Sequence, residues 1–349
     1  MNEKSITVSV ILPVRNEEKY IGKCLKSILE NDFPQDEVEI LVVDGRSEDR
    51  SREVISTIAG LHPNVRLVDN PKRIVSPGLN AAIRLAKGRY IIRMDAHSEY
   101  PSNYISACVR ELSKGDAEVV GGRLITKPGA ETLAARAIAL LSQHPFGVGN
   151  SGFRLGWKGR YVDTVPFGAF RREIFDRIGL FREALIRHQD FEMNARIRRA
   201  GGKIFLSPDI YLNYYNLPCV SALLRRAFRD GLWVSRAWVR YPITFCGRHC
   251  APLVLLLALL LPLLVSPILR GAELVTLAVF STYFLLMLIS SVQIALRESM
   301  RMLLILPLLF MSFHTVYGVG LLCGLFTAAA IPREQTTLAT EAQSLAEAA

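Results

Sequence analysis

The sequence predicts an α/β fold with a mostly parallel sheet, followed by a membrane-spanning helical region. Two observations predict the sheet. Short apolar runs rich in β-branched residues alternate with helical patterns over the first 125 residues, and two of these runs end in an aspartate. A third observation predicts the membrane region, since residues 250–349 hold 4 Lys+Arg and 5 Asp+Glu, against 38 and 27 in residues 1–249. A wholly soluble single domain is therefore excluded.

The elements of the first 125 residues follow from hydrophobic periodicity. Residues 8–13 (VSVILP) and 39–43 (EILVV) are short apolar runs of the kind that forms buried parallel strands. Segments between the runs place apolar residues three and four apart, which predicts helices. The expected strands are 8–13, 39–43, 65–68, 90–94 and 119–124, and the expected helices are 20–29, 51–61, 77–86 and 102–112.

Residues 126–240 carry a weaker pattern. Helices are predicted at 130–142, 191–200 and 220–239, and a strand is predicted at 203–206. A Gly-rich stretch at 147–159 separates the first of these helices from the others. The helix at 220–239 is amphipathic and rich in arginine.

Three apolar segments at 251–269, 274–296 and 302–330 each reach the length of about 20 residues that a bilayer span needs. We expect a domain at 1–240, a helical membrane region of about three spans at 241–332, and a polar tail at 333–349. The basic excess of residues 1–249 places the first domain in the cytosol. The acidic tail is then expected on the outer side.

Several classes of protein are excluded by what the motifs lack. The residues after the first strand are PVRNE rather than GxGxxG, which argues against a dinucleotide fold, and there is no phosphate-binding GxxxxGK[ST] motif. No nucleic-acid-binding motif accompanies the basic charge. The six cysteines form no CxxC pair and fit a reducing compartment. Met1–Ser5 shows no signal peptide before the first strand.

Two acidic residues stand where strands end. Asp44 follows EILVV, and Asp95 follows YIIRM and precedes Ala96 and His97. In an open parallel sheet, ligands bind beyond the carboxyl ends of the strands. An acid-x-His pair in such a loop is able to hold a divalent cation that neutralises a diphosphate. The alternative is that each aspartate is a turn residue or a helix N-cap.

Four motifs in order resemble those of family 2 glycosyltransferases, which have the GT-A fold. They are VSVILPVRNEEKYIGKCLKSI, EILVVDGRSEDRS, GRYIIRMDAH and RHQDFEMNARIRRAGGKI, and the resemblance covers residues 6–240. Within the family, the D-A-H form and the membrane tail look most like transferases of succinoglycan-type exopolysaccharide assembly.

The resemblance implies a nucleotide pocket and a metal site. Pro13, Arg15 and Glu17 would line the nucleotide pocket, and Asp44 would hydrogen-bond the base. Asp95 would lie at the ribose and the metal. His97 would take the metal-ligand position where most members have an aspartate. The expected cation is Mn²⁺ or Mg²⁺, since a neutral imidazole is able to bind either.

The resemblance also implies a general base. Asp190 in HQDFE matches the aspartate of the family's E-D motif, although Gln189 replaces the glutamate. Independently, an inverting sugar transfer needs one carboxylate to take the proton of the acceptor hydroxyl. The alternative is that Asp190 caps a helix beginning at Phe191.

Arg226 and Arg229 occupy the Gln and Arg positions of the Q-x-x-R-W motif of processive members. Asp230 stands in place of the tryptophan, which argues against processive polymerisation. Arginine suits bidentate phosphate contact, so both arginines are candidate ligands of a diphosphate. The alternative is a basic face on anionic lipid headgroups.

The expected activity is the inverting transfer of a hexose from a nucleotide-sugar, a UDP-sugar, to a lipid-linked saccharide in exopolysaccharide or cell-envelope glycan assembly. The expected location is a bacterial-type plasma membrane, with several spans and a cytosolic catalytic domain. The expected partners are the nucleotide-sugar, the lipid-linked acceptor and the membrane, without nucleic acid. A polyprenyl-phosphate glycosyltransferase and an inactive membrane scaffold are the alternatives.

Overall fold

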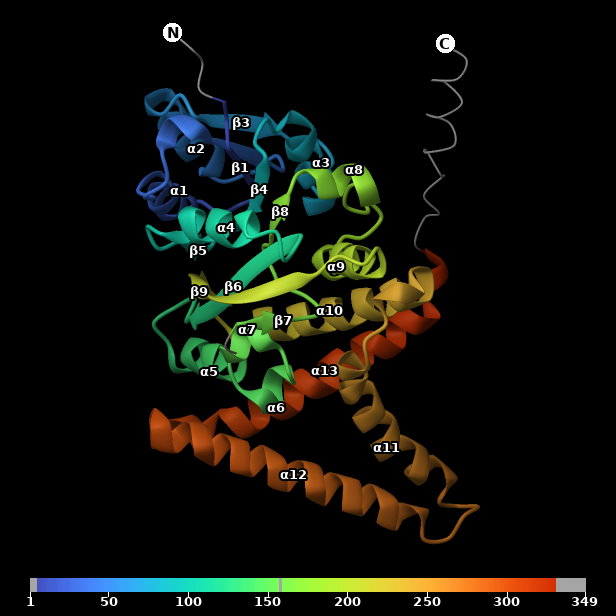
Figure 1. The fold of residues 1–349 in the computed structure, drawn as a ribbon. Coiled ribbons are helices and arrows are strands. Elements are labelled where there is room, and N and C mark those ends of the chain that lie inside the picture. The colour runs from blue at the N-terminus through green and yellow to red at the C-terminus, as the bar shows by residue number, and fades with distance from the viewer. Residues whose placement is uncertain (1–4, 157–158, 331–349) are drawn as a thin grey trace, which may run out of the picture.

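The computed structural model describes residues 5–156 and 159–330, and most of the N-terminal part is one mixed sheet with helices on both faces (Figure 1). Eight strands follow the order β3-β2-β1-β4-β8-β6-β9-β5, and β7 pairs with β9. β1 to β4 pair in parallel, whereas β8 is antiparallel to β4 and to β6. The strands are β1 (Val8–Val14), β2 (Val38–Asp44), β3 (Val65–Asp69), β4 (Tyr90–Arg93), β5 (Ser98–Glu99), β6 (Val119–Lys127), β7 (Arg160–Tyr161), β8 (Ala169–Arg171) and β9 (Ile204–Tyr215).

Two apolar cores lie on the two faces of this sheet, because its central strands are buried on both sides. One core contains residues of α1 and α4, and the other contains residues of α3, α8 and α9. This is the pattern that continuous apolar runs predict for parallel strands. The helices of this part are α1 (Ile21–Leu29), α2 (Ser51–Leu61), α3 (Val75–Leu85), α4 (Tyr104–Ser113), α5 (Leu133–Leu141), α6 (Pro145–Val148), α7 (Gly152–Leu155), α8 (Glu173–Ile178), α9 (Gln189–Arg199) and α10 (Val220–Arg240).

The register of the parallel strands brings the predicted aspartates to one edge. Val14 of β1 lies opposite Asp44 of β2, and Ile11 of β1 lies opposite Arg93 at the end of β4. Asp95 follows β4 by two residues. The carboxyl ends of β1, β2 and β4 therefore meet at the same edge of the sheet, as the fold class predicts.

β9 is much longer than the expected strand at 203–206. It runs for 12 residues, and its register against β6 shifts between Gly121 and Arg123. The irregularity accommodates Pro208 and Asp209, which interrupt the apolar pattern in the sequence. As a result, the strand continues to Tyr214, which pairs with Ser98 just beyond His97.

Three C-terminal helices are long and apolar enough to cross a membrane, as expected. They are α11 (Ala251–Val265), α12 (Ala272–Arg297) and α13 (Leu306–Phe326), and residues Gly247–Cys250 extend the first as a 3₁₀ turn. Figure 1 shows α11 leading away from the sheet, α12 running back below α6, and α13 lying along α10. The expected tail at 333–349 lies outside the described residues.

Glycines allow α10 and α13 to pack closely. A Cβ at Gly320 would overlap the carbonyl of Phe228, and one at Gly324 would overlap the side chain of Ser235. Gly320 and Gly324 are four residues apart, the spacing of small residues at helix contacts in membranes. The helix that carries Arg226 is thus fixed to the membrane region.

Candidate active site

An imidazole lies between two carboxylates where β4 ends. Nδ1 of His97 is 2.9 Å from Oδ1 of Asp95 and 3.2 Å from Oε1 of Glu17. Burial alone would lower the pKa of His97, but Asp95, Tyr214 and Glu17 outweigh it and hold that pKa well above its usual value. Burial alone would raise the pKa of Asp95, but His97 and Arg93 keep it below its usual value. The loop therefore holds a charged Asp95–His97 pair.

Asp190 lies in the first turn of α9 and forms an ion pair with Arg93 of β4. The Arg93 side chain is 5% exposed and the Asp190 side chain 25%. Burial lowers the pKa of Arg93 to about 10, and the nearby Asp95 opposes this shift. The N-cap of α9 is His188, so the alternative that Asp190 caps a helix starting at Phe191 is wrong. Its carboxylate is instead held beside the Asp95 loop.

Tyr214 connects this loop to α10. Its ring lies 4.9 Å from that of His97, and its hydroxyl accepts a hydrogen bond of 3.0 Å from Nη1 of Arg226. The guanidinium of Arg154 lies over the same ring at 5.9 Å. Burial would raise the pKa of Tyr214, but Arg226 and His97 lower it to about 8. Tyr214 thus stands in a strongly positive environment.

Two arginines pair with one carboxylate near Tyr214, and a third lies over the Tyr214 ring. Asp230 accepts from Nη1 of Arg187 at 2.8 Å and lies 3.5 Å from Nε of Arg226. Arg154 comes from α7, and its buried Nη1 has no hydrogen-bond partner among the described residues. This Arg154–Arg187–Arg226 group, the arginine cluster, has an excess of positive charge and suits an anionic ligand. Arg229, the other predicted phosphate ligand, lies exposed on α10.

The residues predicted for the nucleotide lie at the neighbouring edge. Asp44 is fully buried and accepts hydrogen bonds from the Ser47 hydroxyl at 2.6 Å and from Nη1 of Arg52 at 3.1 Å. Arg15 is exposed, and Pro13 is half-buried at the end of β1. Asp44 therefore shapes the loop at 44–47, while Arg15 is open to a ligand.

A divalent cation has a limited set of ligands here. Among residues 5–156 and 159–330, no group of three or more His, Cys, Asp and Glu side chains is arranged to hold a metal ion. Asp95 and His97 form a pair. Mg²⁺ and related cations are often held by one or two protein ligands together with substrate phosphates. The pair fits a cation that arrives with a diphosphate, once His97 has released its proton.

Sequence reasoning missed several residues of the site. Arg93 and Arg187 lie inside two of the four motifs without an assigned role there, Arg154 and Tyr214 lie outside the motif sequences, and only the fold brings the four residues together. The arginine in YIIRM was the one available indication, because a charged residue inside a buried parallel strand needs a partner. That partner is Asp190.

Comparisons with known proteins agree with the fold and the motifs. Residues 9–179 match the family described as Glycosyl transferase family 2. A mannosyltransferase from Pyrobaculum calidifontis, solved in complex with GDP-Man and Mn²⁺, superposes with a TM-score of 0.56 at 20% identity over 89% of this chain and 86% of its own. This likeness confirms the GT-A-like fold.

Two curated relatives cover most of the chain. A dolichyl N-acetyl-alpha-D-glucosaminyl phosphate 3-beta-D-2,3-diacetamido-2,3-dideoxy-beta-D-glucuronosyltransferase of Methanococcus voltae is 26% identical over 91% of this chain and 97% of its own length. The succinoglycan biosynthesis protein ExoA of Rhizobium meliloti is 29% identical over 75% of this chain and 76% of its own length. The chain is a glycosyltransferase with a family 2 catalytic domain, and its apolar helices associate it with a membrane.

Proposed function

We propose that this chain is an inverting hexosyltransferase that moves a hexose from a nucleotide-sugar, a UDP-sugar, to a lipid-linked saccharide. The reaction takes place at the cytosolic face of a bacterial-type plasma membrane, in exopolysaccharide or cell-envelope glycan assembly. In this proposal residues 1–240 are catalytic, 241–332 cross or line the membrane, and 333–349 form a tail. The names of the two relatives support a lipid-linked or exopolysaccharide product.

One observation carries the proposal. Asp190, a carboxylate able to act as a base, is ion-paired with Arg93 of β4, the strand that leads to the Asp95–His97 pair. The ring of Tyr214 lies against His97, and Arg154 and Arg226 of the arginine cluster contact Tyr214. An inverting transfer needs these three functions together. It needs a base, a group at the donor diphosphate, and positive charge for the leaving group.

The donor would bind along the carboxyl edge of β1, β2 and β4. Pro13 and Arg15 would line the nucleotide pocket, and Glu17 would orient His97 through the 3.2 Å contact. Asp44 would act at the base from the loop that it fixes with Ser47. These roles rest on position in the motif and at the sheet edge.

The diphosphate would lie between the Asp95–His97 pair and the arginine cluster. A divalent cation held by this pair, Mn²⁺ or Mg²⁺, would supply charge neutralisation for the diphosphate when bound. Arg226 would hydrogen-bond the departing oxygens from α10, and Arg229 would act from the exposed side of that helix. Their charges favour the leaving nucleoside diphosphate.

Asp190 would be the base in a single displacement. The acceptor oxygen forms a bond to the anomeric carbon from the side opposite the diphosphate, while the bond from that carbon to the diphosphate oxygen breaks. The hydroxyl proton passes to Asp190, and the nucleoside diphosphate leaves with the bonding electron pair. Arg93 stabilises the ionised form of Asp190 before the reaction.

A second acceptor class is favoured by one observation. The arginine cluster is carried in part by α10, which packs along α13, so it would also suit the phosphate of a polyprenyl phosphate near the lipid surface. Assaying transfer to polyprenyl phosphate against transfer to a lipid-diphosphoryl saccharide separates the two acceptors.

The donor is tested with purified detergent-solubilised protein. Thermal unfolding is followed with UDP-glucose, UDP-galactose, UDP-N-acetylglucosamine and GDP-mannose, each with Mn²⁺. A specific donor should raise the midpoint by mass action. Asp95→Asn should abolish the rise, and Asp209→Asn, at an exposed residue paired with Arg110, should retain it. Stabilisation by GDP-mannose alone would contradict the UDP-sugar assignment, and no stabilisation by any donor would contradict the proposed function.

A further inference from the structure

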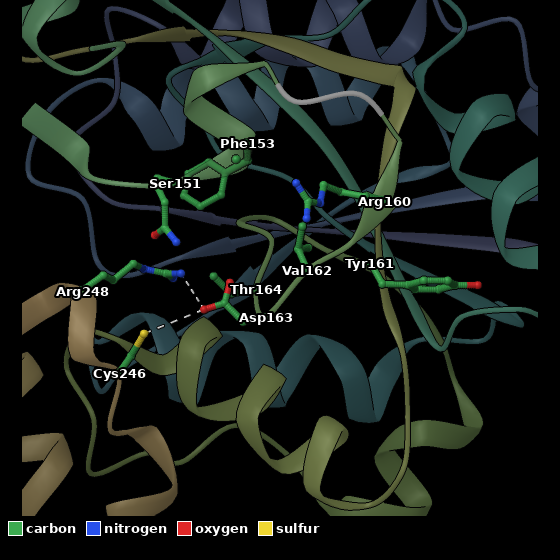
Figure 2. Close-up of a pocket in the computed structure, with 11 residues that line it drawn as sticks. Ser151, Phe153, Arg160, Tyr161, Val162, Asp163, Thr164, Cys246 and Arg248 are labelled. Carbon is green, nitrogen blue, oxygen red and sulfur yellow. Dashed lines mark hydrogen bonds and ion pairs between the residues drawn. The ribbon is translucent and has the colours of Figure 1, made fainter. Parts of the chain in front are cut away.

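A pocket of about 380 Å³ lies between the Gly-rich segment and the start of the first apolar helix (Figure 2). Its volume falls in the range of small-ligand pockets. Figure 2 shows Ser151 and Phe153 on one side, Arg248 and Cys246 on another, and Asp163 joined to both Arg248 and Cys246 by dashed lines. The lining residues are Asn150, Ser151, Gly152, Phe153, Arg160, Tyr161, Val162, Asp163, Thr164, Cys246 and Arg248.

The pocket wall is attached to the helix that carries Asp190. Nδ2 of Asn194 donates to Oγ1 of Thr164 at 2.8 Å and to the carbonyl of Val165 at 3.0 Å. Asn194 and Asp190 are four residues apart on α9, so they share a face at a separation of about 6 Å. The wall of the pocket at Thr164 is therefore hydrogen-bonded to α9 one helical turn after Asp190.

A second contact ties the pocket to the same helix. The guanidinium of Arg248 lies over the ring of Phe191 at 5.6 Å, and the Arg248 side chain pairs with Asp163 at 2.6 Å. On the opposite wall, Phe153 precedes Arg154 of the arginine cluster. The pocket is thus linked through Phe191 to the helix turn of Asp190 and through Phe153 to Arg154 of the arginine cluster.

The lining suits a saccharide. Asp163, Arg248, Asn150 and Ser151 present carboxylate, guanidinium, amide and hydroxyl groups, which pair with the hydroxyls of a sugar. Phe153 offers a ring for the apolar face of a pyranose. Arg248 lies in the 3₁₀ turn Gly247–Cys250 that leads into α11, so the pocket is at the base of the membrane region, where the lipid part of an acceptor would be anchored.

We propose that this pocket binds the terminal sugar of the lipid-linked acceptor and directs its hydroxyl to Asp190. The inference rests on the proposed function and adds the place and the chemistry of acceptor recognition. The Asp163–Arg248 pair makes bidentate contacts to two neighbouring hydroxyls. The arginine cluster is left for phosphate groups.

The test compares two lipids that differ only in the sugar. Binding of farnesyl diphosphate and of farnesyl-diphosphoryl glucose to the full-length protein in detergent is measured by calorimetry. The wild-type protein should bind the glucosyl lipid at least tenfold more tightly than the bare lipid. Ser151→Tyr, which fills the pocket, and Asp163→Asn, which keeps its shape, should reduce that preference to less than threefold. Phe245→Ala, exposed and outside the pocket, is the matched control and should keep it.

The outcomes separate this inference from the proposed function. A preference for the glucosyl lipid that is unchanged in both variants overturns the pocket assignment, as does equal binding of the two lipids by the wild-type protein. Donor-induced thermal stabilisation is measured on the same preparations. If that stabilisation is absent while the pocket variants lose the lipid preference, the pocket stands and the transferase proposal fails.

A separate observation concerns how α13 meets the membrane. Leu306, Leu309 and Phe310 at its start belong to the same apolar cluster as Ile138 and Leu141 of α5. After its end, the hydroxyl of Thr327 accepts hydrogen bonds from Nε and Nη2 of Arg236 of α10 at 3.1 and 2.9 Å. Both ends of α13 are therefore held against helices of the N-terminal part.

We infer that α13 lies along the membrane surface beneath the catalytic domain, and that α11 and α12 alone cross the bilayer. The side of α13 away from α10 is apolar and open, with Leu308 62% and Phe326 82% exposed, as lipid contact requires. The chain then leaves α13 on the catalytic side. This is opposite to the side expected from the acidic charge of the tail.

Cysteine labelling in cells tests this topology. Single cysteines are introduced by Ser344→Cys and by Arg270→Cys, between α11 and α12, into protein lacking its six native cysteines. A membrane-impermeant maleimide should label Arg270→Cys in intact cells and should label Ser344→Cys after permeabilisation only. Labelling of Ser344→Cys in intact cells would show that α13 crosses the bilayer and would overturn the inference.

Discussion

His188 is predicted to make the stability of the protein depend on pH. It is the N-cap of α9, with φ of 69°, and its ring stacks on that of Phe191 with centroids 4.7 Å apart. Burial, together with the positive charge of the neighbouring His249 and Arg248, lowers the pKa of His188 to about 3. The folded protein therefore keeps this imidazole neutral at pH values where the unfolded chain protonates it.

The sign and the size of the effect follow from this difference. An unperturbed histidine has a pKa of about 6.5, so the contribution of His188 is fully present above about pH 6.5. It is lost as the pH falls toward the folded value of about 3. At a pH of about 4.5 the unfolded state gains about 3 kcal/mol relative to the folded state. For a domain of this size, that corresponds to a fall in Tm of roughly 5–10 °C.

The assay compares thermal unfolding of the solubilised protein near pH 7 and near pH 4.5. His188→Asn is the test variant, because asparagine accepts the left-handed backbone and does not titrate. The fall in Tm between the two pH values should be several degrees smaller for His188→Asn than for the wild-type protein. His62→Asn, at an exposed histidine, should keep the wild-type fall. An equal fall in His188→Asn and the wild-type protein would refute the reasoning.

Three further predictions concern the site and its support. Arg93→Met leaves Asp190 without its buried partner, so stability should drop by about 3 kcal/mol in calorimetry, and transfer should drop at least tenfold. His97→Ala should weaken Mn²⁺-dependent donor binding in titrations, and exhaustive EDTA treatment should stop transfer; full transfer after EDTA would leave charge neutralisation to the arginine cluster. Gly324→Leu should overpack the α10–α13 contact and lower Tm, whereas Gly247→Ala, where a Cβ meets nothing within 4 Å, should not.

The parallel half of the sheet was predictable because each of its strands is defined by one continuous run of residues in the sequence. The apolar runs at 8–13 and 39–43 became β1 and β2 with one residue added at one or both ends, and α2 has the predicted bounds of 51–61. These runs are buried on both faces, and their short length and β-branched residues identify them as strands. The aspartates at their ends followed from the same pattern.

The rest of the site depends on contacts between distant segments. Arg93 meets Asp190 across 97 positions of sequence, and Arg154 reaches Tyr214 from a short helix in the Gly-rich stretch. β9 reaches Tyr214 because of a register shift that no local pattern announces. The close packing of α10 on α13 likewise depends on which face of each helix carries its glycines.

The catalytic role of Asp190 is the central claim, and one measurement tests it most directly. Transfer of labelled hexose from the stabilising nucleotide-sugar to farnesyl-diphosphoryl glucose is compared between the wild-type protein and Asp190→Asn, with donor binding measured in parallel. The account predicts a loss of transfer of roughly 10²–10⁴-fold with donor affinity largely retained, because the acceptor hydroxyl loses its base while the donor site is intact. Transfer by Asp190→Asn within about threefold of the wild-type rate would contradict it.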